Sequence, residues 1–193
     1  MTLDNILEEI KKANSIVLLG HENPDGDAVG SCLAMKLALE QMGKNADLIM
    51  PEYPREYEFL PGADTIIKES NVESYDLAIT LDCATTKLMS SFISYFENAK
   101  SKVVIDHHGM NGMYGDFNFV DQEAPACAQL LFVVLNYFKV EITKEIATCL
   151  TAGIITDTNG FRNSSVTSET FRITAELCDT GINLSKIYQT VFS

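Results

Sequence analysis

The side chains with metal-binding or acid–base chemistry are concentrated at a few positions of this chain, beginning with its histidines. The sequence contains only three histidines, His21 and the adjacent pair His107 and His108. An apolar run comes shortly before each position, at residues 16–19 and 102–105. Imidazole is the commonest metal ligand in proteins and titrates near neutral pH. The placement of all three histidines after apolar runs therefore indicates a metal site or an acid–base site.

Five aspartates follow apolar segments in the same way and extend this candidate site. They are Asp25, Asp27, Asp82, Asp106 and Asp157. The ends of parallel strands share one edge of an α/β sheet, and ligands bind along that edge. Carboxylates that converge there would repel one another and raise each other's pKa values unless a cation neutralised them. The pattern therefore predicts bound metal.

The donor types indicate which metal and which reaction to expect. Carboxylate oxygens with one or two imidazoles and no thiolate favour Mn²⁺ or Mg²⁺, with Fe²⁺, Co²⁺ or Zn²⁺ as substitutes. Two ions about 3.5–4 Å apart, bridged by a shared carboxylate, would generate a hydroxide nucleophile at neutral pH and hold a phosphoryl group. The sequence therefore predicts phosphoester hydrolysis. Each aspartate taken singly fits a turn or a helix N-cap, so the prediction depends on their joint occurrence.

Two further residues are candidates for substrate contact. Arg162 follows Asp157 by five residues, and its planar guanidinium could bind a substrate phosphate, with a solvated surface arginine as the alternative. Asn23 begins the turn sequence Asn-Pro-Asp-Gly. The glycines of residues 20–30 match neither the Walker pattern nor Gly-x-Gly-x-x-Gly, which argues against a nucleotide-binding P-loop.

Short runs rich in β-branched residues alternate with helical patterns, and this alternation predicts the elements that position the site. Strands are expected at residues 16–20, 46–50, 76–81, 102–105 and 117–120. Helices are expected at 1–14, 28–42, 87–99, 124–138, 143–156, 168–179 and 185–192. Strand–helix repetition indicates parallel strands with right-handed crossovers. We therefore predict an α/β fold: a five-stranded, mainly parallel sheet flanked by helices and followed by a helical C-terminal segment, in a single domain over residues 1–193.

Composition and charge narrow the possible partners. With 14 Lys and Arg against 27 Asp and Glu, the formal charge of −13 opposes capture of long nucleic acid but allows a small anionic ligand. The five cysteines lack Cys-x-x-Cys spacing and are expected to be buried free thiols in a reducing compartment. The N-terminal pattern lacks the features of a signal peptide, and the longest apolar run, 130–135, is too short to span a bilayer. A cytoplasmic protein without a membrane partner is expected.

Four separated segments resemble the motifs of the DHH phosphoesterase family, which belongs to the RecJ-like superfamily. The segments are His21-Glu22-Asn23-Pro24-Asp25-Gly26-Asp27-Ala28, Leu81-Asp82, Asp106-His107-His108, and Thr156-Asp157-Thr158 followed by Phe161-Arg162. They occur in the family's order and span residues 21–162. The resemblance implies a metal-dependent phosphoesterase that uses two ions, usually Mn²⁺, on a five-stranded parallel sheet.

The resemblance also implies separate roles for the site residues. One ion would be held by His21, Asp25 and Asp82, and the second by Asp82 as the bridge together with Asp27, His107 and Asp157. His108 would be the catalytic imidazole that contacts the phosphate or protonates the leaving oxygen. Asp106 would orient His108 or a metal ligand.

Within the family, Gly26 and residues 156–162 resemble the branch that cleaves very short oligonucleotides (nanoRNA) and 3′-phosphoadenosine 5′-phosphate, whereas the pyrophosphatase branch usually has Thr in place of Gly26. A cyclic-dinucleotide phosphodiesterase and a manganese-dependent inorganic pyrophosphatase are the enzymatic alternatives. A non-catalytic metal- or nucleotide-binding module is the alternative of another class. Family enzymes carry a C-terminal substrate-binding domain that residues 1–193 lack, so low activity is expected of this domain alone. A homodimer is left open.

Overall fold

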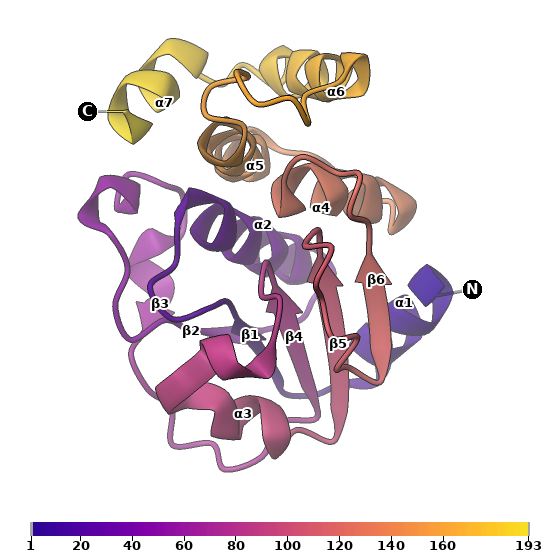
Figure 1. Ribbon diagram of the computed structural model, residues 1–193. Helices are drawn as coiled ribbons and strands as arrows, with labels where there is room; N and C mark the ends of the chain where they lie inside the picture. Colours follow the sequence, from indigo (N-terminus) through magenta and orange to yellow (C-terminus); the bar gives the residue numbers. More distant parts are fainter. Residues whose placement is uncertain (1, 193) are drawn as a thin grey trace.

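Six strands form one parallel sheet within residues 2–192, the part of the chain that the computed structural model describes (Figure 1). Every neighbouring pair of strands is parallel. The strands, in spatial order, are β3 (Ile66–Ile67), β2 (Ala46–Ile49), β1 (Ile16–Leu19), β4 (Leu77–Leu81), β5 (Ser101–Asp106) and β6 (Phe117–Val120). The strands β1 and β4 are buried along their full length, as expected for apolar runs that lie between two layers of helices.

The order of the strands reverses between β1 and β4. The chain runs outward from β1 through β2 to β3 and then returns to β4 on the other side of β1. Leu19 aligns with Thr80, and Leu81 aligns with Ile105, so the C-terminal ends of β1, β4 and β5 lie side by side. Ligands bind at this reversal point in open α/β sheets because the loops on its two sides diverge and leave a crevice.

Helices cover both faces of the sheet and form two further layers above one of them (Figure 1). The helix α3 covers one face, α2 and α4 cover the other, α5 lies on α2 and α4, and α6 and α7 are outermost. A helix packed on several sides must be apolar around most of its circumference, which explains the nine buried residues of α5. The α-helices are α1 (Thr2–Lys12), α2 (Gly26–Gln41), α3 (Ile93–Glu97), α4 (Cys127–Tyr137), α5 (Lys144–Asp157), α6 (Ser168–Asp179) and α7 (Leu184–Val191), and the 3₁₀ helices are η1 (Arg55–Tyr57), η2 (Ala63–Thr65) and η3 (Thr86–Phe92).

Two features of the fold differ from the sequence prediction. The sheet has six strands rather than five, because β3 is a two-residue edge strand and is too short to give a periodic signal. The helix expected at 87–99 is instead η3 followed by α3, and Ser90 interrupts it with φ 42° and ψ −111°. The α/β class, the parallel sheet and the helical C-terminal segment are confirmed. The helix expected at 1–14 begins at Met1, which lies outside the described residues.

The membrane-spanning potential of the helices and the state of the cysteines can be compared with the expectations from the sequence. No helix within residues 2–192 is long and apolar enough to cross a membrane. All five cysteines are free thiols; four are buried, and Cys178 is partly exposed.

Candidate metal centre

The loop between β1 and α2 supplies the first three site residues. His21 lies just after β1, and Asp25 is the N-cap of α2. The Asp25 Oδ1 accepts hydrogen bonds from the backbone N–H groups of Asp27 (3.0 Å) and Ala28 (3.1 Å). The Asn-Pro-Asp-Gly sequence therefore acts as a turn and a helix start, and it also presents two carboxylates at the sheet edge.

The remaining site residues follow β4, β5 and α5. Asp82 is the first residue after β4 and has φ 54°, a left-handed conformation that is uncommon for residues other than glycine. Its backbone N–H donates to the Ile105 carbonyl at 3.1 Å, which joins the ends of two neighbouring strands. His107 and His108 follow β5, and Asp157 is the last residue of α5. A strained residue that is held by its surroundings, such as Asp82, is typical of functional sites.

These residues form two adjacent groups that meet at Asp82. In the first group, ligand atoms of His21, Asp25 and Asp82 all lie within 4.8 Å of one another, and His21 Nε2 is 3.8 Å from Asp82 Oδ2. In the second group, ligand atoms of Asp27, His107 and Asp157 lie equally close together.

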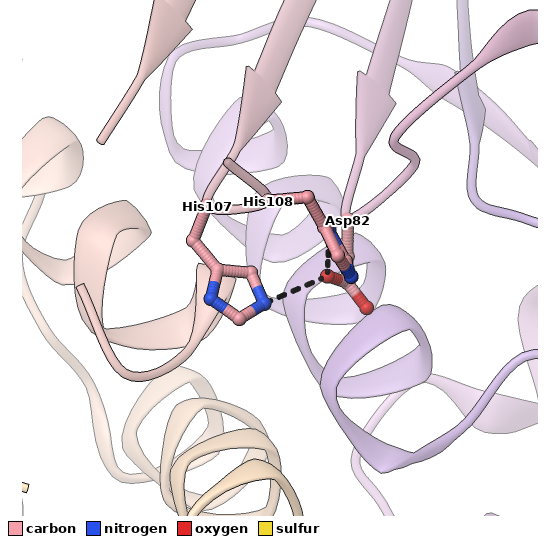
Figure 2. Close-up of side chains that lie close together, drawn as sticks. All are labelled: Asp82, His107 and His108. Atoms are coloured by element: carbon pink, nitrogen blue, oxygen red, sulfur yellow. Dashed lines mark ion pairs between the residues drawn. The ribbon is translucent and has the colours of Figure 1, made fainter. Parts of the chain in front are cut away.

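His107 connects the second group to the first. Its Nε2 is 3.1 Å from Asp157 Oδ2, 3.4 Å from Asp82 Oδ1 and 3.8 Å from Asp27 Oδ2. Figure 2 shows the Asp82 carboxylate reaching the rings of both His107 and His108 from the end of the neighbouring strand. The structure thus brings all six predicted metal ligands together, with Asp82 between the two groups.

The ring nitrogens of His21 and His107 are arranged as in metal-binding histidines. Nδ1 of His21 lies 2.9 Å from the Glu22 carbonyl, and Nδ1 of His107 lies 3.1 Å from the Ala124 carbonyl. A carbonyl oxygen only accepts, so each Nδ1 carries the hydrogen and donates it. Each Nε2 then faces the carboxylates, and this outer hydrogen bond fixes the tautomer and orientation that a metal requires.

Burial and unpaired atoms indicate that a cation fits between the two groups. Asp82 Oδ1 and His107 Nε2 are buried and have no hydrogen-bond partner among the described residues, which is costly unless another group binds them. Burial raises the pKa of Asp27 and of Asp82, and the neighbouring carboxylates raise them further. Burial opposes charge on His107, but the nearby carboxylates of Asp157 and Asp82 raise its pKa to about 11. The site therefore attracts positive charge, and its oxygen and imidazole donors suit Mn²⁺ or Mg²⁺.

Asp27 also holds the start of α4, a helix one hundred residues later in the sequence. Its side chain is fully buried and accepts hydrogen bonds from the backbone N–H groups of Cys127 (2.6 Å) and Ala128 (2.8 Å). The N-cap residue of α4, Ala126, has no capping side chain of its own. The carboxylate therefore satisfies the free N–H groups of one helix while it faces the site.

Close contact between α2, α4 and α5 depends on glycine at position 153. A Cβ atom on Gly153 would lie 2.7 Å from the Cβ of Ala128 and 2.8 Å from Oδ1 of Asp27. We expect Gly153→Ala to lower the free energy of unfolding by about 1–3 kcal/mol, measured by urea denaturation, because overpacking forces backbone shifts. The same substitution should weaken metal binding, because it displaces Asp27.

The matched control is Gly112→Ala, because a Cβ atom there meets nothing within 4 Å. This variant should unfold at the urea concentration of the wild type. If Gly153→Ala were as stable as Gly112→Ala, the three helices would be less tightly packed than the structure indicates.

His108 and Asp106 form a separate pair beside the metal ligands. His108 Nδ1 lies 2.8 Å from Asp106 Oδ1, and this contact raises the pKa of His108. Burial opposes ionisation of Asp106, but its bonds to His108 and Asn111 hold its pKa below the usual value. Asn111 donates from Nδ2 to Asp106 Oδ2 at 2.6 Å. The sequence analysis missed Asn111, although the Asn-Gly turn signal shortly after the histidines was available.

The structure does not bring the two candidate substrate residues into contact with the carboxylates. The Arg162 side chain is exposed beyond the end of α5 and forms no ion pair within residues 2–192. Asn23 is exposed, has φ 57°, and lines a cavity beside His21. Their roles stay predictions.

Comparison with known protein families decides the family of the chain. The model of the DHH family, N-terminal domain, matches residues 15–154, which include every site residue except Asp157 and Arg162. The chain belongs to the DHH family. The matched segment of this DHH domain contains the triad Asp106-His107-His108, as the sequence motifs predicted.

Named relatives and solved structures resemble this DHH domain over nearly its whole length. It is 34% identical, over 94% of the chain, to the bifunctional oligoribonuclease and PAP phosphatase NrnA of Thermus thermophilus. The crystal structure of an exopolyphosphatase-related protein from Bacteroides fragilis superimposes with a TM-score of 0.91 at 27% identity and covers 99% of the chain. The exonuclease RecJ bound to manganese has the same fold, with a TM-score of 0.53 at 16% identity over 98% of the chain and 54% of RecJ.

The DHH domain is shorter than these relatives. The chain spans 56% of the Thermus thermophilus protein and 60% of the Bacteroides fragilis chain. The similarity therefore establishes the family and the fold of this part, and the activity of the longer proteins is carried over only as a proposal.

Proposed function

We propose that this DHH domain is a phosphoesterase that uses two divalent metal ions, usually Mn²⁺, to hydrolyse phosphate esters of small nucleotides and very short oligonucleotides. Its substrates would be nanoRNA and 3′-phosphoadenosine 5′-phosphate. The observation that carries the proposal is the meeting of two ligand groups at Asp82, whose buried Oδ1 has no hydrogen-bond partner in the described chain. The similarity to the Thermus thermophilus relative, an oligoribonuclease and PAP phosphatase, supports the substrate class. The manganese bound to the RecJ structure supports the choice of ion.

The proposed chemistry separates metal binding from proton transfer. When bound, the ions would lower the pKa of water and neutralise charge on the phosphoryl group. The residues that would hold them are His21, Asp25, Asp27, Asp82, His107 and Asp157. Asp106 fixes His108 through Nδ1, so the opposite nitrogen, Nε2, is directed away from that contact. The contact with Asp106 raises the pKa of His108 and so favours the protonated ring, which would donate a proton to the leaving oxygen.

Gly26 favours the nucleotide branch of the family over the pyrophosphatase branch. A Cβ atom on Gly26 would overlap Oγ1 of Thr156 and would lie 2.8 Å from Cε1 of Tyr57. The threonine usual at this position in pyrophosphatases therefore does not fit between α2 and α5 in this chain. The turn that presents Asp25 and Asp27 has no room for a side chain at position 26.

The proposal is tested by measuring Mn²⁺-dependent hydrolysis of four substrates by the purified chain. The substrates are a dinucleotide, 3′-phosphoadenosine 5′-phosphate, a cyclic dinucleotide and inorganic pyrophosphate. We expect hydrolysis of the first two, loss of hydrolysis in EDTA and recovery on addition of Mn²⁺. Hydrolysis of pyrophosphate alone, or of the cyclic dinucleotide alone, would assign the chain to another branch. Calorimetry that detects nucleotide binding without turnover would indicate a non-catalytic module.

A further inference from the structure

A cavity of about 320 Å³ lies beside the first ligand group, and its lining is acidic and apolar. His21 lines it on the side of the metal centre, and the side chains of Met50 and Phe92, both almost fully buried, also line it. Glu22 and Glu52 are its charged residues, and neither lysine nor arginine lines it. The volume is within the range of small-molecule pockets, about 300–1,000 Å³.

This lining suits the nucleoside part of a substrate better than a phosphate. Two carboxylates without a cation repel a phosphate group but accept hydrogen bonds from ribose hydroxyls and exocyclic amines. Met50 and Phe92 offer apolar surface for a base or a sugar. A nucleoside here would adjoin a scissile phosphate held at the metal centre next to His21.

A second cavity, of about 600 Å³, shares part of its wall with the first. Met50, Pro51 and Glu52, directly after β2, line both cavities. The second cavity adds two cations, Arg55 and Lys68. The metal centre, the acidic cavity and the second cavity therefore follow one another along the C-terminal edge of the sheet.

The two cations are available for a ligand. Neither Arg55 nor Lys68 forms an ion pair within the described part of the chain, whereas the lysines of α1 and of the β4–β5 region pair with carboxylates. Glu52 and Glu58 also line the second cavity, which makes it electrically neutral in a chain of charge −13. A free phosphate gains little there, but a phosphate on a nucleoside that is already bound next door meets a planar guanidinium and an ammonium group.

We infer that Arg55 and Lys68 bind the second phosphate of substrates that carry phosphates on both sides of one nucleoside. The scissile phosphate lies at the metal centre, the nucleoside lies in the acidic cavity, and the second phosphate lies beside Arg55 and Lys68 in the second cavity. The class comprises nucleoside 3′,5′-bisphosphates and short oligonucleotides, in which phosphates lie on both sides of a nucleoside. The inference rests on the proposed function and identifies the residues that select this substrate class.

The first experiment measures kcat/KM for two substrates in Mn²⁺ and compares the two values. Wild-type chain is expected to hydrolyse 3′-phosphoadenosine 5′-phosphate with a kcat/KM at least about tenfold above that for adenosine 3′-monophosphate, since one charge-assisted contact alone contributes about this factor. In R55A/K68A the ratio should fall to about one, mainly through KM. The control R172A/K144A removes the same charges from exposed positions outside both cavities and should keep the wild-type ratio.

Binding without metal tests the same residues independently of turnover. In EDTA, the chain is expected to bind adenosine 5′-monophosphate about five- to tenfold more tightly than adenosine, measured by calorimetry, because one charge-assisted contact contributes about that factor. R55A/K68A should bind both ligands equally. A ratio that R55A/K68A leaves unchanged in both experiments would overturn the inference. If neither substrate were hydrolysed, the proposed function would fail, and the EDTA experiment would still decide whether Arg55 and Lys68 bind the phosphate.

Discussion

Replacement of Asp82 by asparagine is expected to abolish Mn²⁺-dependent hydrolysis, with a fall in kcat/KM of at least about a thousandfold. Asp82 belongs to the ligand group of His21, and its Oδ1 lies 3.4 Å from Nε2 of His107 in the ligand group of Asp27, so its loss should weaken both ion sites together. Loss of several kcal/mol of charge stabilisation corresponds to this factor, since about 1.4 kcal/mol is tenfold in rate. Calorimetric titration with Mn²⁺ should show both binding events lost or severely weakened.

The same substitution should not destabilise the metal-free chain, although it abolishes activity. Burial, with Asp25 and Asp157 nearby, raises the pKa of Asp82 in the folded state. A carboxyl whose folded-state pKa is raised lowers stability at pH values above its unfolded pKa, because the unfolded chain ionises more easily. Removing this charge at pH 7 should therefore leave the metal-free chain as stable as the wild type or more stable, by up to about 1 kcal/mol.

Urea denaturation separates the two effects when it is carried out in EDTA and in Mn²⁺. Mn²⁺ should stabilise the wild type by mass action and should not stabilise Asp82→Asn. The control Asp64→Asn makes the same chemical change at an exposed position and should behave as the wild type in both buffers. Wild-type Mn²⁺ affinity in Asp82→Asn would rule out a shared carboxylate at this position.

The adjacent histidines should respond differently to the same substitution. His107→Asn should lose Mn²⁺ binding, because Nε2 of His107 faces Asp27, Asp82 and Asp157. His108→Asn should retain Mn²⁺ affinity within about threefold and lose about 10²–10⁴-fold in kcat, the usual contribution of a positioned acid. The reason is that His108 Nδ1 lies 2.8 Å from Asp106 but 3.7 Å from Asp82.

The alternative for this pair is metal binding by both histidines. Ligand atoms of Asp82, His107 and His108 also lie within 4.8 Å of one another, so these three residues form a third possible metal group. If His108→Asn weakened Mn²⁺ binding as strongly as His107→Asn does, that group would be the one occupied. Equal loss of kcat in both variants with intact metal binding would contradict both assignments.

The central strands and the polar residues after them were predictable from the sequence because β1, β4 and most of β5 are nearly continuous apolar runs. A strand buried on both faces must be apolar at every position, so a polar residue after the run marks its end. Asp82 and the pair His107 and His108 were placed at one edge on this basis. The same reasoning failed for β3, which has only two residues. It also failed at Ser90, because no local sequence pattern predicts its positive φ angle.

Some residues proved to have a structural role in addition to their place in the site. Asp25 was compatible with a simple N-cap, and it is the N-cap of α2, yet the same side chain lies within the first ligand group. The N-cap role is thus observed, and the role of Asp25 as a metal ligand stays a prediction. Asn111 was missed because its importance depends on Asp106, and local sequence does not specify which side chain a turn residue will contact.

The sequence by itself determined the fold class, the family and the set of residues at the sheet edge, because hydrophobic periodicity and strand direction are local properties of the chain. Only the tertiary structure decided that Asp27 binds the start of α4 and that Gly153 permits this approach. It also decided that the cavity lined by Arg55 and Lys68 adjoins the cavity beside His21. These features depend on how closely helices cross and how loops pack against them. Side-chain shape fixes such packing across segments far apart in the chain, and no local pattern encodes it. The candidate metal ligands thus follow from the pattern of strand and helix ends, whereas the cavities beside them follow from packing.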